Sequence, residues 1–246
     1  MDHKEQIRIV HGSHNAVLMI HGIVGTPLHF RDLIPIIPQD WSVYNLLLDG
    51  HGQGVREFAK TSMEKWKTQV RDKLREILES HEQVLIVGHS MGSLFAIQAG
   101  IDYPDRIPAL FLMGCPLRVH MPPKTMALSV RTALGCTDPG ATAMRNDCSV
   151  KLTPKLWRYL SWVPRFWELL AESRRVRGLL PGLNQPTLCC QSRRDELVSM
   201  RSCGDLAGNP VITTVVLENS GHFAYSPEDT EILQDGLRDV IQQFFI

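Results

Sequence analysis

The serine of Gly88-His-Ser-Met-Gly92 has the surroundings that most clearly point to chemistry. A glycine stands two residues before Ser90 and another two residues after it. The motif directly follows the apolar run 84–87 and opens the helical pattern 93–99, and this strand-turn-helix setting presents a serine on a strained turn. Because serine at its ordinary pKa is a weak nucleophile, it needs a base beside it. The pattern predicts Ser90 as a nucleophile.

The base is predicted to be His222, which stands in Asn219-Ser-Gly-His222 after the apolar run 211–217 and before the last helical pattern. His89 lies inside the serine motif, where its side chain should point away from the serine Oγ. His21 and His51 each end a strand and are expected to hydrogen-bond nearby loops. Other histidines are expected at the surface: His3, His11, His14, His81 and His120.

A carboxylate is needed to orient the imidazole and to stabilise its protonated form. Asp195 follows the apolar run 187–190 closely, within Arg193-Arg-Asp-Glu-Leu-Val198. Glu196 is its rival, because it is adjacent and chemically able. The chain order of serine, aspartate and histidine, with the spacing of Asp195 to Val198, favours Asp195 as the acid.

Two backbone N–H groups are needed to stabilise the oxyanion of a tetrahedral intermediate. The residue after the nucleophile, Met91, is expected to supply one. The loop 21–27, which follows the first core strand, is expected to supply the other from Ile23. Only the backbone of Ile23 matters for this role, so its apolar side chain is no objection.

Buried strands and amphipathic helices alternate along the chain and must position these groups. Continuous Val, Ile and Leu runs are typical of strands that are covered on both faces. They occupy 16–20, 41–48, 84–87, 109–113, 187–190 and 211–217, and a short edge strand is expected at 7–10. Helices are predicted at 62–80, with Thr61 or Ser62 as its cap, at 90–101 and at 227–245. This order predicts an α/β fold, a mostly parallel central sheet with helices on both faces.

One stretch departs from the alternation. Residues 116–184 lack a convincing strand, are rich in proline and carry an excess of seven positive charges. We interpret them as a small helical cap inserted into a core made of residues 1–115 and 185–246. Trp162 and Phe166 are candidates to line an acyl pocket, and the alternative is that they form the cap's own small core and pack it onto the sheet. The basic excess either offsets the acidic core domain or recognises an anionic substrate or lipid surface.

Composition excludes several classes of protein. The net charge is zero, so nucleic acid is not an expected partner, and the absence of a long apolar run predicts no stable membrane insertion. The N-terminus does not have the pattern of a signal peptide, and the six cysteines show neither redox nor zinc spacing. A cytoplasmic location is expected. Neither a cofactor nor a metal is expected, since the chain has no GxGxxG after a strand, no P-loop and no ligand cluster.

With these residues in place, the sequence resembles the α/β-hydrolase family, and within it the bacterial carboxylesterase and monoacylglycerol-lipase branch. The matching segments are HGIVGTP (21–27), LLLDGHGQG (46–54), GHSMGS (88–93), RRDELVS (193–199) and NSGHF (219–223). The chain departs from the family pattern at Gly50, Ser93 and Ser199. The resemblance implies hydrolysis of a small-molecule carboxylic ester through an acyl-enzyme.

The same frame hosts other chemistries. A thioesterase, an amidase, a carbon–carbon hydrolase and an acyltransferase are alternatives on the same three residues, and a non-enzymatic ligand-binding protein is a further one. The natural substrate, its acyl-chain length and the oligomeric state are left open by the sequence.

Overall fold

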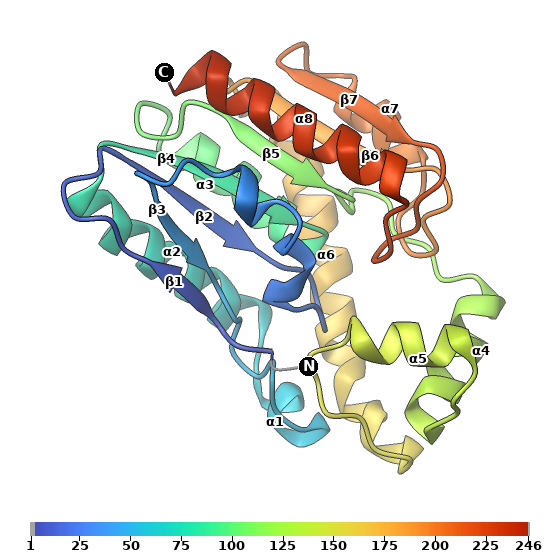
Figure 1. Ribbon diagram of the computed structural model, residues 1–246. Helices are drawn as coiled ribbons and strands as arrows, with labels where there is room; N and C mark the ends of the chain where they lie inside the picture. The colour runs from blue at the N-terminus through green and yellow to red at the C-terminus, as the bar shows by residue number, and fades with distance from the viewer. Residues whose placement is uncertain (1–2, 246) are drawn as a thin grey trace.

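A computed structural model describes residues 3–245, which form a sheet with helices on both of its faces (Figure 1). Within this range seven strands pair in the order β1-β3-β2-β4-β5-β6-β7, and all pairs are parallel except β1 with β3. The strands are β1 Gln6–Arg8, β2 Asn15–Ile20, β3 Ser42–Asn45, β4 Gln83–His89, β5 Leu110–Met113, β6 Thr187–Ser192 and β7 Ile212–Leu217. The predicted fold class is confirmed. The strand expected at 41–48 is shorter, because the chain leaves the sheet after Asn45.

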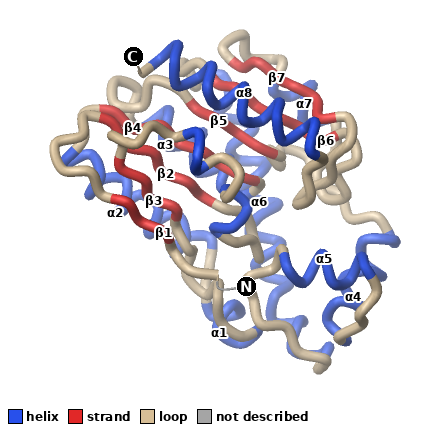
Figure 2. Tube along the Cα trace, viewed as in Figure 1, coloured by secondary structure: helices blue, strands red, loops and turns tan. Residues whose placement is uncertain are grey.

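The helices lie between the strands and against both faces of the sheet (Figure 2). The α-helices are α1 Val55–Lys60, α2 Met63–Ser80, α3 Met91–Asp102, α4 Pro123–Leu134, α5 Pro139–Asn146, α6 Val163–Leu179, α7 Arg201–Leu206 and α8 Pro227–Phe244. The 3₁₀ helices are η1 Pro27–Phe30, η2 Ile34–Ile36, η3 Leu156–Trp162 and η4 Leu180–Gly182. Helix α2 begins where the sequence predicts, because the Ser62 hydroxyl accepts the N–H of Lys65 at 3.2 Å.

Each face of the sheet buries its own apolar core. Strand β2 shows why its sequence is apolar throughout. Ala16, Leu18 and Ile20 point into the core beneath α2, α3 and α6, whereas Val17 and Met19 point into the core beneath α8. All five side chains are fully buried. A strand covered on both faces must be apolar at every position. Because the strands are packed in this way, the loops that follow β2 and β4 start from fixed positions.

Residues 116–184 contain α4, α5, η3 and α6, and α4 and α5 lie to one side of the sheet (Figure 1). Their described residues join the sheet region through two isolated bridges, Lys151 with Gly54 and Val119 with Val198. The backbone N–H of Ser149 donates to the carbonyl of Val24 at 3.1 Å. The connection between α5 and η3 therefore rests on the loops that follow β2 and β3.

One histidine was wrongly expected at the surface. His81 is only 6% exposed, and its Nδ1 lies 3.0 Å from the carbonyl oxygen of Ile77 in the last turn of α2. The Arg106 guanidinium covers the same helix end by donating to the carbonyls of Leu78 and His81. The imidazole is therefore buried against the helix end, on a carbonyl that also accepts the backbone N–H of His81. Over residues 3–245, no helix is both long and apolar enough to cross a membrane.

Candidate active site

Ser90 lies on a sharp turn between β4 and α3, with φ of 53° and ψ of −124°. This is a strained conformation for a residue with a side chain. A Cβ atom on Gly92 would lie 1.9 Å from the carbonyl oxygen of Ile20, and one on Gly88 would lie 2.7 Å from the Cα of Ser93. The two glycines of the motif are therefore required by the close approach of backbone on both sides of the turn.

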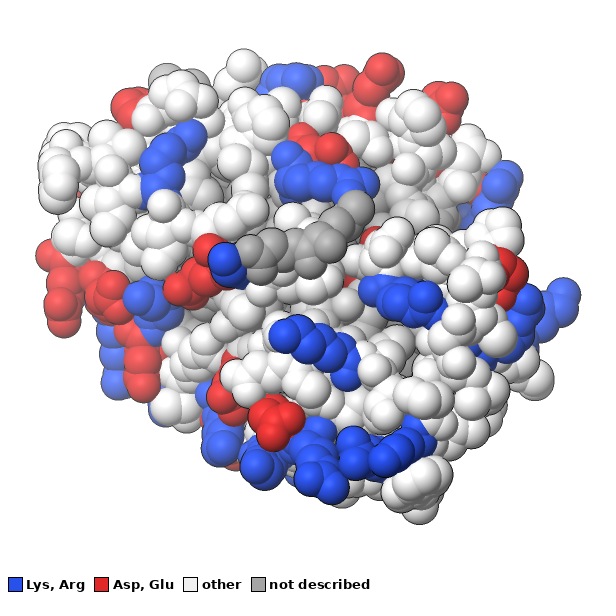
Figure 3. Space-filling model, turned by 60° about the horizontal axis from the view of Figure 1, so that its bottom comes forward, with Lys and Arg blue, Asp and Glu red and all other residues white. Residues whose placement is uncertain are grey.

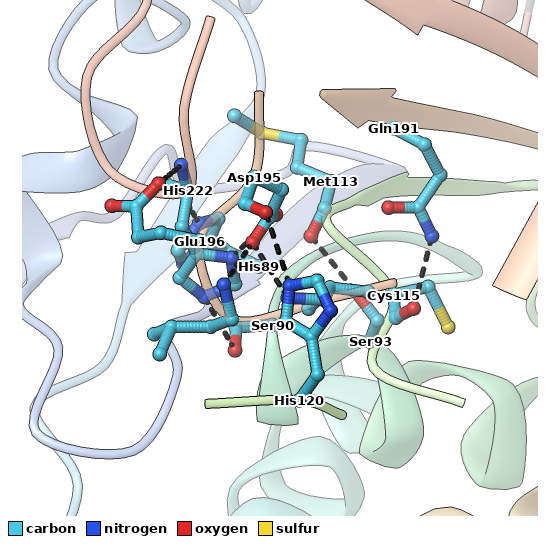
Figure 4. A network of polar contacts seen from close by, with 12 residues as sticks. His89, Ser90, Ser93, Met113, Cys115, His120, Gln191, Asp195, Glu196 and His222 are labelled. Atoms are coloured by element: carbon cyan, nitrogen blue, oxygen red, sulfur yellow. Dashed lines mark hydrogen bonds and ion pairs between the residues drawn. The ribbon is translucent and has the colours of Figure 1, made fainter. Parts of the chain in front are cut away.

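Ser90, His222 and Asp195 are joined by two hydrogen bonds (Figure 4). The Ser90 hydroxyl donates to His222 Nε2 at 2.9 Å, and His222 Nδ1 donates to Asp195 Oδ2 at 2.7 Å. The three residues follow β4, β7 and β6 respectively, so they meet at the carboxyl edge of the parallel sheet. The structure brings together the three residues that the sequence predicts as nucleophile, base and acid.

Asp195 is held as a carboxylate by its surroundings. Its Oδ1 accepts the backbone N–H groups of Leu197 at 2.8 Å and of Val198 at 2.7 Å. Burial by itself would raise the pKa of Asp195, but the His222 imidazole and the two N–H groups together lower that pKa below its ordinary value. A carboxylate fixed in this way keeps the neighbouring imidazole in the tautomer that has a free Nε2 lone pair.

Glu196, the sequence's alternative acid, makes a different contact. Its Oε2 accepts the backbone N–H of His222 at 3.0 Å, so it touches the histidine's backbone and not its ring. A Cβ atom on Gly221 would lie 2.8 Å from the same oxygen, so the loop needs glycine there to let the carboxylate approach. The two adjacent acids thus contact two different parts of one histidine, its ring and its backbone.

The loop after β2 lies directly over the serine. A Cβ atom on Gly22 would be 2.6 Å from the Cβ of Ser90. His21 fixes this loop, because its Nδ1 donates to the carbonyl of Gly22 at 2.8 Å and its Nε2 accepts the N–H of Leu48 at 3.1 Å. Among residues 3–245, the N–H groups of Ile23 and Met91 have no acceptor within the protein. Both are available to bind an oxyanion formed beside Ser90.

Comparison with known proteins assigns this architecture. A family model described as the alpha/beta hydrolase fold matches residues 15–134. The structure superposes on a metagenome-derived lipolytic enzyme with a TM-score of 0.75 and 23% sequence identity, over 98% of each chain. The protein has the α/β-hydrolase fold. The fold that the resemblance implies is thereby confirmed.

Two further comparisons extend the result. The monoacylglycerol lipase of Paleococcus ferrophilus superposes on this structure with a TM-score of 0.68 and 15% identity, over 97% of this chain and 98% of that one. An uncharacterized protein of Mycobacterium tuberculosis is 32% identical over 118 residues, which cover 44% of this chain. The matched region spans about a third of that relative's length, since it covers 34% of it.

Analysis of the sequence missed His29. The His29 ring lies 4.9 Å from the ring of His89, and its Nε2 donates to the carbonyl of Asp147 at 3.1 Å. His89 in turn donates from Nε2 to the carbonyl of His222 at 3.0 Å. Burial, with the nearby histidines, lowers the pKa of His29, and it lowers that of His89 to about 3. Only tertiary packing brings His29 here, because a single histidine in a short 3₁₀ helix has no pattern that marks it.

The two predicted pocket residues, Trp162 and Phe166, differ in their surroundings. Trp162 is 7% exposed, its Nε1 donates to the carbonyl of Val55 at 3.0 Å, and its ring lies 4.5 Å from that of Phe58. This packing favours the alternative interpretation for Trp162, because its contacts fix residues 116–184 onto α1 of the core. Phe166 is half-buried against the same apolar cluster. Between residues 3 and 245, no group of three His, Cys, Asp or Glu side chains is arranged to hold a metal ion.

Proposed function

We propose that the protein is a serine hydrolase that cleaves carboxylic esters through an acyl-enzyme on Ser90. The observation that carries the proposal is the hydrogen-bonded series from Ser90 Oγ to His222 to Asp195, with the free N–H groups of Ile23 and Met91 beside it. A nucleophile, a base, an orienting carboxylate and two oxyanion donors are the parts that acyl transfer requires.

In the first half of the proposed reaction, Ser90 Oγ attacks the ester carbonyl carbon while its proton passes to His222 Nε2. The carbonyl oxygen takes the negative charge and receives hydrogen bonds from the N–H groups of Ile23 and Met91. The Asp195 carboxylate stabilises the imidazolium. The bond to the alcohol then breaks, and His222 returns the proton to the leaving oxygen, which leaves Ser90 acylated.

In the second half, a water molecule replaces the alcohol. His222 takes a proton from this water as its oxygen attacks the acyl carbon, and the same two N–H groups bind the oxyanion. Collapse of the intermediate returns the proton to Ser90 Oγ and releases the carboxylic acid. The cycle uses the three side chains and the two N–H groups twice and needs no other group of the protein.

The site allows several chemistries, and the names of two similar structures favour ester cleavage among them. One is a lipolytic enzyme and another a monoacylglycerol lipase. We propose that residues 116–184 act as a cap over a core made of 1–115 and 185–246. The acyl chain would lie beneath this cap. Phe166 is the better candidate to line its pocket, because Phe166 is half-buried, whereas Trp162 is already buried against α1.

The test combines a covalent label with a panel of substrates. A fluorophosphonate is expected to label the wild-type protein and the Ser93→Ala variant, but not Ser90→Ala. Ser93 is a suitable control because its hydroxyl donates to the carbonyl of Gly88 at 2.9 Å and does not contact His222. On p-nitrophenyl and glyceryl esters of graded length, Ser90→Ala should lower kcat/KM by about three powers of ten or more.

The other possible results of this test would each indicate a different conclusion. Near-native hydrolysis by Ser90→Ala would show that the nucleophile lies elsewhere. Labelling of Ser90 without turnover of any ester would direct the search to thioesters, amides, carbon–carbon bonds or an acyl acceptor other than water. An unlabelled wild-type protein would favour a ligand-binding protein without catalysis.

A further inference from the structure

Residues 148–167 differ in composition from the rest of the chain. Across these twenty positions there is no Asp or Glu, whereas Lys151, Lys155, Arg158 and Arg165 are all basic. The same stretch holds three of the chain's five tryptophans. In the structure it forms the approach to η3, η3 itself and the first turn of α6. The proposed reaction uses none of its charged residues.

Four large apolar side chains of this stretch lie exposed in one row. Trp157, Leu160 and Val163 follow one another at intervals of three, which places them in line on a 3₁₀ helix such as η3. Trp167 follows Val163 by four residues on the α-helix, which keeps it on the same side. Their exposed fractions are 66%, 72%, 45% and 63% in chain order. Scattered exposed apolar residues are ordinary, but a continuous row that includes two tryptophans marks an interaction surface.

Positive charge without a partner accompanies this row. Within residues 3–245, no carboxylate forms an ion pair with Lys155 or Arg158, which lie on either side of Trp157 in the sequence. Arg165, by contrast, is paired with Glu168 and donates to the carbonyl of Thr61. Lys and Arg side chains gather along the lower edge of the molecule in Figure 3, a view that brings the lower end of Figure 1 forward.

We infer that this surface, the row of Trp157, Leu160, Val163 and Trp167 with Lys155 and Arg158, docks on an anionic phospholipid surface. Tryptophan prefers the boundary between headgroups and acyl chains, and a helix with apolar and basic faces lies in that boundary. Cations beside it are attracted by anionic headgroups. Because the row is exposed and is bordered by cations that are unpaired within residues 3–245, a charged lipid surface fits it better than a neutral apolar partner.

This binding goes beyond the proposed hydrolysis and does not require it. The two are connected in space, since η3 continues from the segment in which Ser149 donates to the carbonyl of Val24, next to Ile23. The surface also rests on the core through Trp162, whose indole donates to Val55 at the start of α1. A lipid surface bound at η3 would therefore lie at the end of a segment that contacts the loop of Ile23.

Binding is measured by sedimentation with vesicles of equal parts phosphatidylglycerol and phosphatidylcholine, and with pure phosphatidylcholine. Every protein carries Ser90→Ala, so that hydrolysis of the vesicles plays no part. We expect binding to the anionic vesicles only, and weaker binding as salt is added. Each cation contributes about fivefold to such binding, so Lys155→Gln with Arg158→Gln should weaken it about thirtyfold. Trp157→Ser with Trp167→Ser should weaken it at least as much.

Matched controls change the core surface. Arg31→Gln with Arg201→Gln removes two charges there, and Ile9→Ser removes an exposed apolar side chain that is 59% accessible. These controls should bind within about twofold of the parent. No binding to anionic vesicles, or equal loss in the controls, would overturn the inference. It would also be overturned if the wild-type chain formed a dimer in light scattering that the tryptophan changes abolish, because a second copy would then be the occupant. If the wild-type protein proved not to hydrolyse esters, the proposed function would fail, but this binding measurement would be unaffected.

Discussion

Lowering the pH from 8 to 5 is expected to reduce the free energy of unfolding by about 4 kcal/mol through His51 and His89 alone. Both imidazoles are buried, with exposed fractions of 2% and 0%. Burial is the main cause that lowers their pKa, to about 4 for His51 and to about 3 for His89. In the unfolded chain each would return to the ordinary value of about 6.5.

The hydrogen bonds explain why a second proton is excluded. His51 Nδ1 donates to the carbonyls of Leu48 and Asp49, and His89 Nε2 donates to that of His222, so each ring already uses its one N–H group. The remaining ring nitrogen of each is buried without a partner in residues 3–245. A proton added there would create a buried charge with an unsatisfied donor.

The sign of the effect follows from proton uptake. Between the folded and unfolded pKa values the unfolded chain binds more protons, so stability is fully present above about pH 6.5 and is lost as the pH falls below it. At pH 5 each of these two residues contributes about 2 kcal/mol of this loss. Paired carboxylates such as Asp195, whose pKa is lowered, lose their contribution only at more acidic pH.

Urea unfolding at half-unit steps between pH 8 and pH 5 measures this loss. The His51→Gln variant will be less stable in general, so its informative quantity is the slope of stability against pH. That slope should fall by about 1.2 kcal/mol per pH unit, which corresponds to most of one proton, between pH 5 and 6. His11→Gln, at an exposed position, is the control. A total change below about 1 kcal/mol, or an unchanged slope in His51→Gln, would refute the reasoning.

Three further predictions concern the site and its supports. Asp195→Asn should lower kcat by about 10⁴-fold and Glu196→Gln by less than tenfold, because Glu196 contacts only the backbone of His222; equal losses in steady-state kinetics would reopen the choice of acid. Gly92→Ala should destabilise the protein by about 3 kcal/mol or more, because its Cβ would overlap the Ile20 carbonyl. Gly178→Ala on α6 is the control in urea unfolding, and it should stabilise the protein by about 0.5 kcal/mol because there is open space around it. Trp162→Phe should lower stability by about 1–2 kcal/mol through the lost hydrogen bond to Val55, with an unchanged preference for acyl-chain length; a changed preference would put Trp162 in the pocket.

The elements with strong local signals could be predicted from the sequence. The apolar runs of β2, β4 and β5 need apolar residues at every position because both faces are covered, so their place on the chain is visible without a structure. Helices α1 and α7 were missed. Each has six residues, which is fewer than two turns, so neither can show a full amphipathic period.

Some residues of the candidate site could be predicted from the sequence and others could not. Strand ends mark Ser90, Asp195 and His222, because parallel strands deliver their carboxyl ends to one edge. The sequence could not show how Glu196 and His29 are used. Glu196 is next to Asp195 in the chain, and only the path of the loop decides which of the two faces the ring. The contact of His29 with Asp147 joins residues 118 positions apart, and nothing local encodes it.

The order of the triad along the chain has a consequence for biosynthesis. The Ser90–His222 hydrogen bond spans 132 residues, whereas the Asp195–His222 bond spans 27. A chain emerging from the ribosome therefore presents the serine turn, between β4 and α3, well before the residues that follow β6 and β7, Asp195 and His222, are made. Long-range pairings of this kind form late in folding. The nascent chain would therefore have its serine turn in place before His222 could activate Ser90. In refolding after dilution from denaturant, recovery of fluorophosphonate labelling would report the docking of β7 on β6.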